Sequence, residues 1–344
     1  MLRLQMLPAG CGDCLWLEYG PPGESRIVII DGGVSDTAKA LRRRIETALQ
    51  EREGTVLEVE LLVVTHIDND HILGIIELLK APDLPVRFKD IWFNGKPQLL
   101  RLAAQADESD QAESAAHAAR PPDLMGDAQD DAADDLHGER DRWSDEAPPA
   151  AALRQPGGPP LVVSDLLGAQ QADQLSDTLG RLGLPCNTHD RWNGGPVWVP
   201  AAGALPVVTL DGGLRLTLLG PTRPRLLKLC AAWSDVLGGR DEAAPPGHGL
   251  PADLLGRRDR WPPVWQDGEG RDPSAANGSS IMLLAEFDGQ ALLLAADGHA
   301  PDLATALDRF AQARPTGPTG RLKLAGFKLP HHGSEKNLSR AILD

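Results

Sequence analysis

At 344 residues with 42% hydrophobic side chains, the chain is long enough to bury a sizeable core, as one large domain or two ordinary ones. It has no apolar run of 18 residues and does not open on a charged and then apolar leader, so we expect a cytoplasmic protein without a membrane segment. The formal net charge of −15 speaks against an anionic polymer as ligand, because such polymers are normally bound by basic surfaces.

Most of the negative charge is concentrated in one segment. Residues 101–150 hold fourteen Asp or Glu against four Arg, a balance of −10, and the remainder of the chain is only mildly acidic. When this segment is set aside, the charge no longer excludes nucleic acid as a substrate.

The first hundred residues alternate between predicted strands and helices. Alternating or continuous apolar residues between turn signals predict the strands, and longer periodic runs predict the helices. The expected strands are Leu2–Leu7, Cys14–Tyr19, Arg26–Ile30, Val56–Thr65 and Val86–Phe93, and the expected helices are Thr37–Arg52 and Ile72–Lys80. The first two strands form a hairpin-like opening, and the whole pattern is typical of a layered α/β fold.

A cluster of polar side chains follows the apolar run at residues 61–64. His66, Asp68, Asp70 and His71 place four potential metal ligands within six residues, on a predicted strand-to-helix loop. Imidazole nitrogen and carboxylate oxygen together suit zinc, manganese or iron(II). Alternating donors can direct the first two residues to one ion and the last two to another. An exposed polar loop with satisfied histidines is the alternative, but so dense a cluster after a buried strand favours a metal site.

The second half of the chain contains two irregular stretches within one predicted domain spanning residues 1–344. Residues 102–160 lack apolar periodicity and are predicted to be a disordered acidic insertion, and residues 238–276 form a second irregular insertion. The expected helices are Leu161–Gly183, Arg223–Leu237 and Pro301–Ala311, and the expected strands are Val197–Val199, Val207–Leu210, Leu214–Leu219, Ser280–Phe287, Gln290–Ala296 and Leu322–Leu329. Asp288-Gly289 predicts a tight hairpin turn.

Further potential ligands lie where other predicted strands end. Asp31 and Asp297 each follow a strand, and the last strand runs into His331-His332. Each residue taken alone is explained as a turn or capping residue. Their shared position at strand ends predicts that one site gathers them with the loop of His66 to His71.

The chain has four cysteines, and two of them form the C-x-x-C of Cys11 and Cys14. This motif is compatible with a redox pair or with half of a zinc knuckle. Cys186 and Cys230 are isolated, so buried or loop thiols are the simpler interpretation.

These residues resemble the metallo-β-lactamase-fold hydrolases, and within them the branch of the ComEC-type metallo-hydrolase domain, which carries H-x-D-x-D-H. The matching segments are Gly12-Asp13, Ile30-Asp31-Gly32-Gly33, Thr65 to His71, Asn277-Gly278-Ser279-Ser280, Leu294-Ala295-Ala296-Asp297 and Leu329-Pro330-His331-His332-Gly333-Ser334. The resemblance implies an αββα four-layer sandwich and two divalent metal ions, zinc or manganese. It also implies that relatives continue beyond the last residue, so that the chain is a truncated or cleaved form.

The resemblance also implies roles for single residues. His66 and Asp68 would serve the first metal, Asp70 and His71 the second, and Asp297 would bridge them. His331 would complete the second site, with His332 as the alternative. The histidine of the third family motif has no match here, since His189, His248 and the Asn277 region all remain open, and His299 is expected to act behind the ligands.

The function implied is hydrolysis by a metal-activated water, which Asp70, with Asp68 beside it, would orient. Asn277, Ser280 and Lys328 are candidates to contact substrate oxygens. The ComEC-type branch implies a nuclease or phosphodiesterase acting on nucleic acid. The charge balance of −10 in residues 101–150 leaves two interpretations of the acidic insert, a solvated and tolerated insertion or a latch on an electropositive groove that a protease or partner protein releases. An acyl hydrolase for lactones, thioesters or β-lactams is the alternative, and a non-catalytic metal-stabilised partner in an assembly is the second. Substrate, native metal and oligomeric state stay open.

Overall fold

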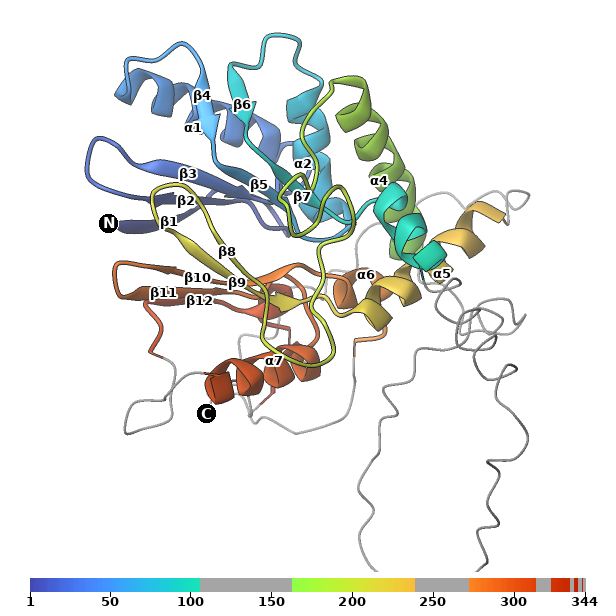
Figure 1. Cartoon of the computed structure of the whole chain (residues 1–344). Coiled ribbons are helices and arrows are strands. Elements are labelled where there is room, and N and C mark those ends of the chain that lie inside the picture. The colour runs from blue at the N-terminus through green and yellow to red at the C-terminus, as the bar shows by residue number, and fades with distance from the viewer. Residues whose placement is uncertain (106–162, 239–271, 314–322, 335–336, 340–341, 343–344) are drawn as a thin grey trace, which may run out of the picture.

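The computed structural model describes residues 1–105, 163–238, 272–313, 323–334, 337–339 and 342 (Figure 1). The acidic insertion predicted over 102–160 and the irregular segment over 238–276 lie largely outside the described residues. The described part is a mixed α/β fold, as expected, built on two five-stranded sheets.

The first sheet has the order β1-β2-β3-β5-β7. Its strands are β1 (Leu2–Met6), β2 (Leu15–Tyr19), β3 (Arg26–Ile30), β5 (Leu61–Val64) and β7 (Ile91–Phe93). The β1, β2 and β3 neighbours pair antiparallel, whereas β3, β5 and β7 run parallel. Because both faces of this sheet are covered, β2 and β5 are buried at every position, and β5 accordingly reads as a continuous apolar run.

The second sheet has the order β12-β11-β10-β9-β8. Its strands are β8 (Val207–Thr209), β9 (Arg215–Gly220), β10 (Met282–Phe287), β11 (Gln290–Leu294) and β12 (Gly326–Lys328). The predicted hairpin between β10 and β11 is confirmed, and its turn residues Asp288 and Gly289 have φ of 49° and 71°. Positive φ at both positions is what the two-residue hairpin turn requires.

Two apolar clusters define the layers. One joins residues of the first sheet such as Leu17 and Val28 to residues of the second such as Leu216 and Leu283, and it continues to Leu303. The other joins the opposite face of the first sheet to a group of helices. These helices are α1 (Thr37–Glu51), α2 (Asn69–Leu79), α4 (Val163–Arg181) and α5 (Arg223–Gly238). Helix α7 (Ala300–Ala313) lies on the far side of the second sheet (Figure 1).

Several predicted boundaries were wrong. The strand expected over Val56–Thr65 divides into β4 (Leu57–Val59) and β5, and that over Val86–Phe93 into β6 (Val86–Phe88) and β7. Strands β4 and β6 pair with each other in a separate two-stranded sheet. The strand expected over Val197–Val199 is a single bridge between Val199 and Thr222. Residues 96–105 are helical and bury Leu102, so ordered chain continues past the predicted start of the acidic insertion.

The expected helix over Ile72–Lys80 begins three residues earlier, at Asn69. Asp68 stands at its N-cap position and Asp70 in its first turn, where an acidic side chain is favoured by the helix dipole. Asp70 and His71 therefore lie on a helix and not on a free loop. No helix in the described part of the chain is long and apolar enough to cross a membrane.

Candidate metal centre

The ends of five strands meet at one edge of the two sheets. Asp13 precedes β2, Asp31 follows β3, and His66 and Asp68 follow β5. From the second sheet, Asp297 follows β11 and His331-His332 follow β12. The structure thus brings together the residues that the sequence placed at separate strand ends, and it adds Asp13 to them.

The carboxylate of Asp297 is the centre of this arrangement. Its Oδ2 lies 3.4 Å from Nε2 of His71, 3.6 Å from Nε2 of His332, and 4.0 Å from Nε2 of both His66 and His331. The side chain is 3% exposed. One oxygen therefore faces imidazole nitrogens from two different parts of the chain.

Donor atoms gather around this oxygen in overlapping sets. One set is His66, His71 and Asp297, and another is Asp70, His71 and His332, each with its donor atoms within 4.8 Å of one another. Asp68 lies 3.7 Å from Nε2 of His66, and Asp70 lies 3.6 Å from Nε2 of His332. We call His66, Asp68, Asp70, His71, Asp297 and His332 the metal cluster.

The donor atoms of the metal cluster fit a metal ion. Nε2 of His66, Nε2 of His71 and Oδ1 of Asp68 are all buried, and none has a hydrogen-bond partner within the described part of the chain. A buried polar atom without a partner costs about 1–3 kcal/mol, so such atoms call for an explanation. Nitrogen and carboxylate oxygen are the donors that zinc and manganese take.

Asp31 and Thr65 set the tautomers of the two buried histidines. Asp31 is fully buried, and its Oδ2 accepts hydrogen bonds from the Thr65 hydroxyl at 2.7 Å and from Nδ1 of His71 at 2.9 Å. Because the hydroxyl proton is directed to Asp31, Thr65 Oγ1 is left to accept from Nδ1 of His66, 2.9 Å away. Both rings therefore keep a proton on Nδ1, so that each ring in its neutral form presents the lone pair of Nε2 to the cluster.

The buried acidic and basic groups of the site shift one another's pKa values. Burial alone would raise the pKa of Asp297, but the positive charges of His71, His66 and Lys328 outweigh it and keep that pKa well below the ordinary value. Burial would likewise lower the pKa of His71, yet Asp297 and Asp31 together raise it well above the ordinary value. The buried carboxylates of Asp297 and Asp31 thus favour positive charge at the site, already on the neighbouring histidine.

The backbone at the site adopts unusual conformations. Four residues of the site have φ in the left-handed region, which residues other than glycine seldom adopt: Asp31 (58°), Ala296 (47°), His331 (46°) and His332 (53°). Each such residue costs on the order of 1–3 kcal/mol, and such strain concentrates at functional sites. Gly12 is needed for a different reason, since a Cβ there would overlap the backbone carbonyl of Asp70.

His331 is held by a residue that the sequence did not single out. Its Nδ1 lies 3.4 Å from Oδ2 of Asp272 and 3.0 Å from Oδ1 of Asn337. The hydrogen bond to Asp272 raises the pKa of His331 to about 9. Asp272 also accepts from Nδ2 of Asn277 at 2.6 Å and from Nδ2 of Asn337 at 3.0 Å. No local pattern marks Asp272, because it lies in the Pro- and Gly-rich stretch that reads as irregular.

Asn277 and Ser280 lie on and just after the short helix α6 (Ala275–Gly278). Both are buried, and Asn277 Oδ1 and Ser280 Oγ have no hydrogen-bond partner in the described structure. The next residue, Ile281, donates its N–H to the Thr65 carbonyl at 2.9 Å, so this segment runs beside the start of the metal loop.

The remaining histidines differ in position. His299 is buried, with Nε2 3.9 Å from Asp272 and Nδ1 3.9 Å from Asp302, and burial lowers its pKa. It therefore lies behind His331, in line with the expected supporting role. His189 is exposed, its Nδ1 accepts from the Arg191 N–H at 3.2 Å, and it is in none of the donor groups of the described chain. His248 lies outside the described residues.

The cysteines of the C-x-x-C motif are both free thiols. Cys11 is exposed, whereas Cys14 is buried in the core, where burial raises its pKa to about 12. A thiol so strongly protonated is a poor metal ligand and a poor nucleophile. The site is therefore made of histidines and carboxylates.

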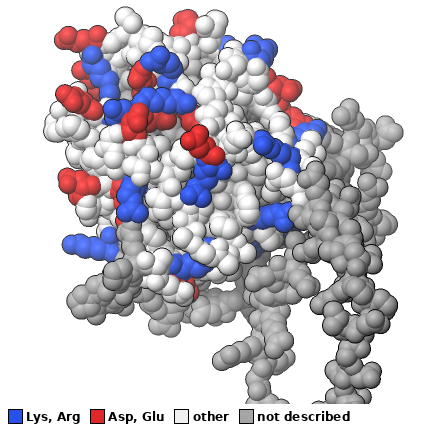
Figure 2. All heavy atoms as spheres, viewed as in Figure 1, with Lys and Arg blue, Asp and Glu red and all other residues white. Residues whose placement is uncertain are grey.

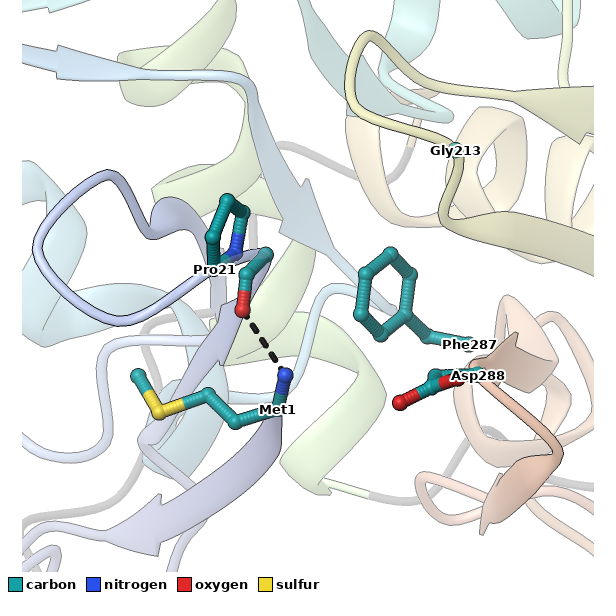
Figure 3. A pocket seen from close by; sticks show the side chains of 6 residues that line it. Met1, Pro21, Gly213, Phe287 and Asp288 are labelled. Atoms are coloured by element: carbon teal, nitrogen blue, oxygen red, sulfur yellow. Dashed lines mark hydrogen bonds between the residues drawn. The ribbon is translucent and has the colours of Figure 1, made fainter.

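A hollow of about 360 Å³ lies at the opposite ends of the strands (Figure 3). It is lined by Met1, Gly20, Pro21, Gly213, Phe287 and Asp288. Asp13 precedes β2 while Gly20 follows it, and Ser280 precedes β10 while Asp288 follows it. The hollow is thus separated from the metal cluster by the length of the strands, and its lining offers no set of catalytic groups.

Comparison with known proteins gives a family for the chain. Residues 10–299 match the model of the family described as the Metallo-beta-lactamase superfamily. No curated protein matches the chain.

Proposed function

The chain belongs to the metallo-beta-lactamase superfamily, and we propose that it is a metal-dependent hydrolase. We propose further that it cleaves phosphodiester bonds in nucleic acid. The observation that carries the hydrolase proposal is the position of Asp297 Oδ2 between donor groups from two sides. A carboxylate so placed can bridge two ions. The packing of the elements supports the four-layer αββα arrangement that the resemblance implies: helices α1 and α2 cover the first sheet, the first sheet packs on the second, and α7 covers the second.

We assign the ligands to two metals, zinc or manganese. His66 and Asp68 would hold the first, Asp70, His71 and His332 would hold the second, and Asp297 would serve both. His332 takes the place first expected for His331, because His332 shares a donor group with Asp70 and His71 and has its Nε2 3.6 Å from Asp70, whereas His331 is in none of the donor groups found among the described residues. When bound, two such ions would supply an activated water and would neutralise charge on the attacking and leaving oxygens.

The remaining catalytic roles are assigned to side chains of the protein. Asp70 is only partly buried, so its carboxylate can accept a hydrogen bond from the attacking water, with Asp68 next to it. Asp31 and Thr65 keep the histidine rings in their required tautomers. The side chain of His331 is 36% exposed and has its Nε2 directed toward the cluster, so it is available to a substrate oxygen.

Nucleic acid as the substrate rests on the resemblance to the ComEC-type H-x-D-x-D-H loop. On the face drawn in Figure 2, Lys and Arg are interspersed with Asp and Glu and are not gathered into one basic patch. The surface charge of that face therefore adds no support, and an acyl hydrolase remains the alternative. A non-catalytic, metal-stabilised partner in an assembly is the second alternative; the donor residues kept at every strand end argue against a decayed enzyme.

The deciding experiment is a substrate panel. Metal-loaded protein is incubated with plasmid, single-stranded oligonucleotide, a chromogenic β-lactam and an acyl ester. We expect cleavage of nucleic acid that is abolished by Asp70→Ala and kept by Asp36→Ala, whose side chain is 87% exposed and pairs with Lys39. Circular dichroism checks that both variants are folded. Turnover of the ester or β-lactam alone would transfer the proposal to the acyl hydrolases, and full nuclease activity in Asp70→Ala would remove Asp70 from the mechanism.

We propose further that the enzyme is cytoplasmic and that its acidic insertion holds it in a latent state. Fourteen acidic side chains in residues 101–150 can compete with a phosphate backbone for positive charge, and a protease or partner protein would release them. Replacing residues 106–148 with a short Gly-Ser bridge tests this. The deletion should raise nuclease activity at low salt and have less effect at high salt, because salt screens exposed charges. Equal effects at both salt concentrations would contradict electrostatic inhibition.

A further inference from the structure

Lys328 and Asp13 lie just behind the metal cluster, at the end of β12 and before β2. Their side chains are 5% and 3% exposed. Lys328 Nζ forms an ion pair with Oδ2 of Asp13, donates to the Ala296 carbonyl at 3.0 Å, and lies 3.5 Å from Oδ1 of Asp297. An ammonium group so enclosed by protein acceptors is not free to bind a substrate oxygen.

The two carboxylate oxygens of Asp297 therefore have different partners. Oδ1 faces Lys328, and Oδ2 faces the histidines of the metal cluster. Unless it is held, a carboxylate between two metals can rotate or bind one ion through both oxygens. The contact with Lys328 leaves Oδ2 as the oxygen turned toward the donor groups.

Asp13 completes this unit in two ways. Its Oδ2 pairs with Lys328, so the added positive charge is balanced and does not oppose the binding of cations. Its Oδ1 lies 3.5 Å from Nδ1 of His332, whose Nε2 is 3.6 Å from Asp70. Asp13 is thus placed toward His332 as Asp31 is placed toward His71, with a carboxylate at Nδ1 and the other ring nitrogen toward the cluster.

We propose that Asp13 and Lys328 form a charge-balanced positioning pair, in which Lys328 holds Oδ1 of Asp297 away from the metals and Asp13 cancels the lysine charge and orients His332. This inference rests on the metal ligands of the proposed function, and it is independent of the substrate. It removes Lys328 from the groups expected to contact substrate.

The test measures zinc binding to the full-length chain by calorimetry, in parallel with unfolding of the metal-free protein in urea. Asp13→Asn leaves Lys328 as an unbalanced cation beside Asp297 and should weaken zinc binding by about 10- to 100-fold. Lys328→Met should destabilise the metal-free protein without weakening zinc binding, because the loss of the contact that holds Oδ1 of Asp297 is offset by the removal of a positive charge near the ions. The double variant restores the balance and should recover at least half of the loss seen in Asp13→Asn, on a logarithmic scale.

The control is Arg44→Met, which breaks a different buried ion pair. Arg44 is 10% exposed and lies 2.5 Å from Glu18, away from the metal cluster. This variant should lose stability and keep the zinc affinity of the wild type. If Asp13→Asn does not fold, the double variant still must fold and bind zinc.

Two results would overturn the inference: wild-type zinc affinity in Asp13→Asn, or a double variant that binds zinc no better than Asp13→Asn. A wild-type protein that binds no zinc would instead remove the metal site of the proposed function. Failure of the substrate panel would leave the positioning pair untouched.

Discussion

Replacing Asp31 with asparagine exchanges one carboxylate oxygen for an NH2 group and should disturb two residues of the metal cluster, His66 and His71. Asp31 Oδ1 accepts from the Thr65 N–H at 2.8 Å, so the amide oxygen of an asparagine must take that position. Its NH2 group then replaces Oδ2, which accepts from the Thr65 hydroxyl and from Nδ1 of His71. A donor thus meets two donors, and asparagine also tolerates the φ of 58° at this position.

The rearrangement follows from the hydrogen-bond chain. His71 loses the acceptor of its Nδ1 proton, and the Thr65 hydroxyl turns to donate to Nδ1 of His66. Both rings then favour the tautomer with the proton on Nε2, the atom that must bind metal. Loss of such a supporting contact weakens metal binding by about 10- to 100-fold, or about 1.4–2.8 kcal/mol.

The same substitution lowers stability by a predictable amount. Two hydrogen bonds to a buried carboxylate are lost, each of about 1.5–3 kcal/mol, and one is partly remade when the new amide donates to Thr65. We expect a net loss of about 3 kcal/mol, which a domain with a stability of about 5–15 kcal/mol survives.

Zinc titration calorimetry and nitrogen-detected NMR of the histidine rings measure both effects. Asp36→Asn, at an exposed position, is the matched control and should behave as the wild type. If Asp31→Asn binds two zinc ions with wild-type affinity and unchanged tautomers, the reasoning on Asp31 and Thr65 is refuted.

Two further predictions test the assignment of single side chains. His332→Ala should lose one of two bound ions, whereas His331→Ala should keep both, as measured by elemental analysis of the desalted proteins; the reverse result would restore His331 as the ligand. A thiol reagent should label Cys11 within minutes at pH 8 and leave Cys14 unlabelled up to about pH 10 in the folded protein, because burial raises the Cys14 pKa to about 12. Rapid labelling of Cys14 in the native state would show that its environment is not the apolar one described.

The donor types of the site were predictable because they are concentrated in short motifs. His66 to His71 supply four residues of the metal cluster within six positions, and strand ends pointed to Asp31 and Asp297. The start of α2 was predicted too late, although Asp68 and Asp70 are typical of a helix N-terminus; the polar cluster was interpreted as a loop because of its metal ligands.

Other features depend on contacts between distant segments and leave no local pattern. The sequence indicated Asp13 only as part of the Gly12-Asp13 motif and not its role, because its partners Lys328 and His332 are at the other end of the chain. Asp272 holds Asn337 and His331 from within a stretch without periodicity. Neighbouring histidines such as His331 and His332 are distinguished only by backbone angles and partners in three dimensions.

The most direct test of the account is the metal content of the purified chain. Wild-type protein loaded with zinc or manganese and then desalted should hold two ions per chain, and Asp297→Ala should lose both because its carboxylate serves each. A His66→Ala, Asp70→Ala double variant should retain fewer ions than the wild type. If the wild type holds no more metal than this double variant, the metal cluster does not bind metal and the account is contradicted.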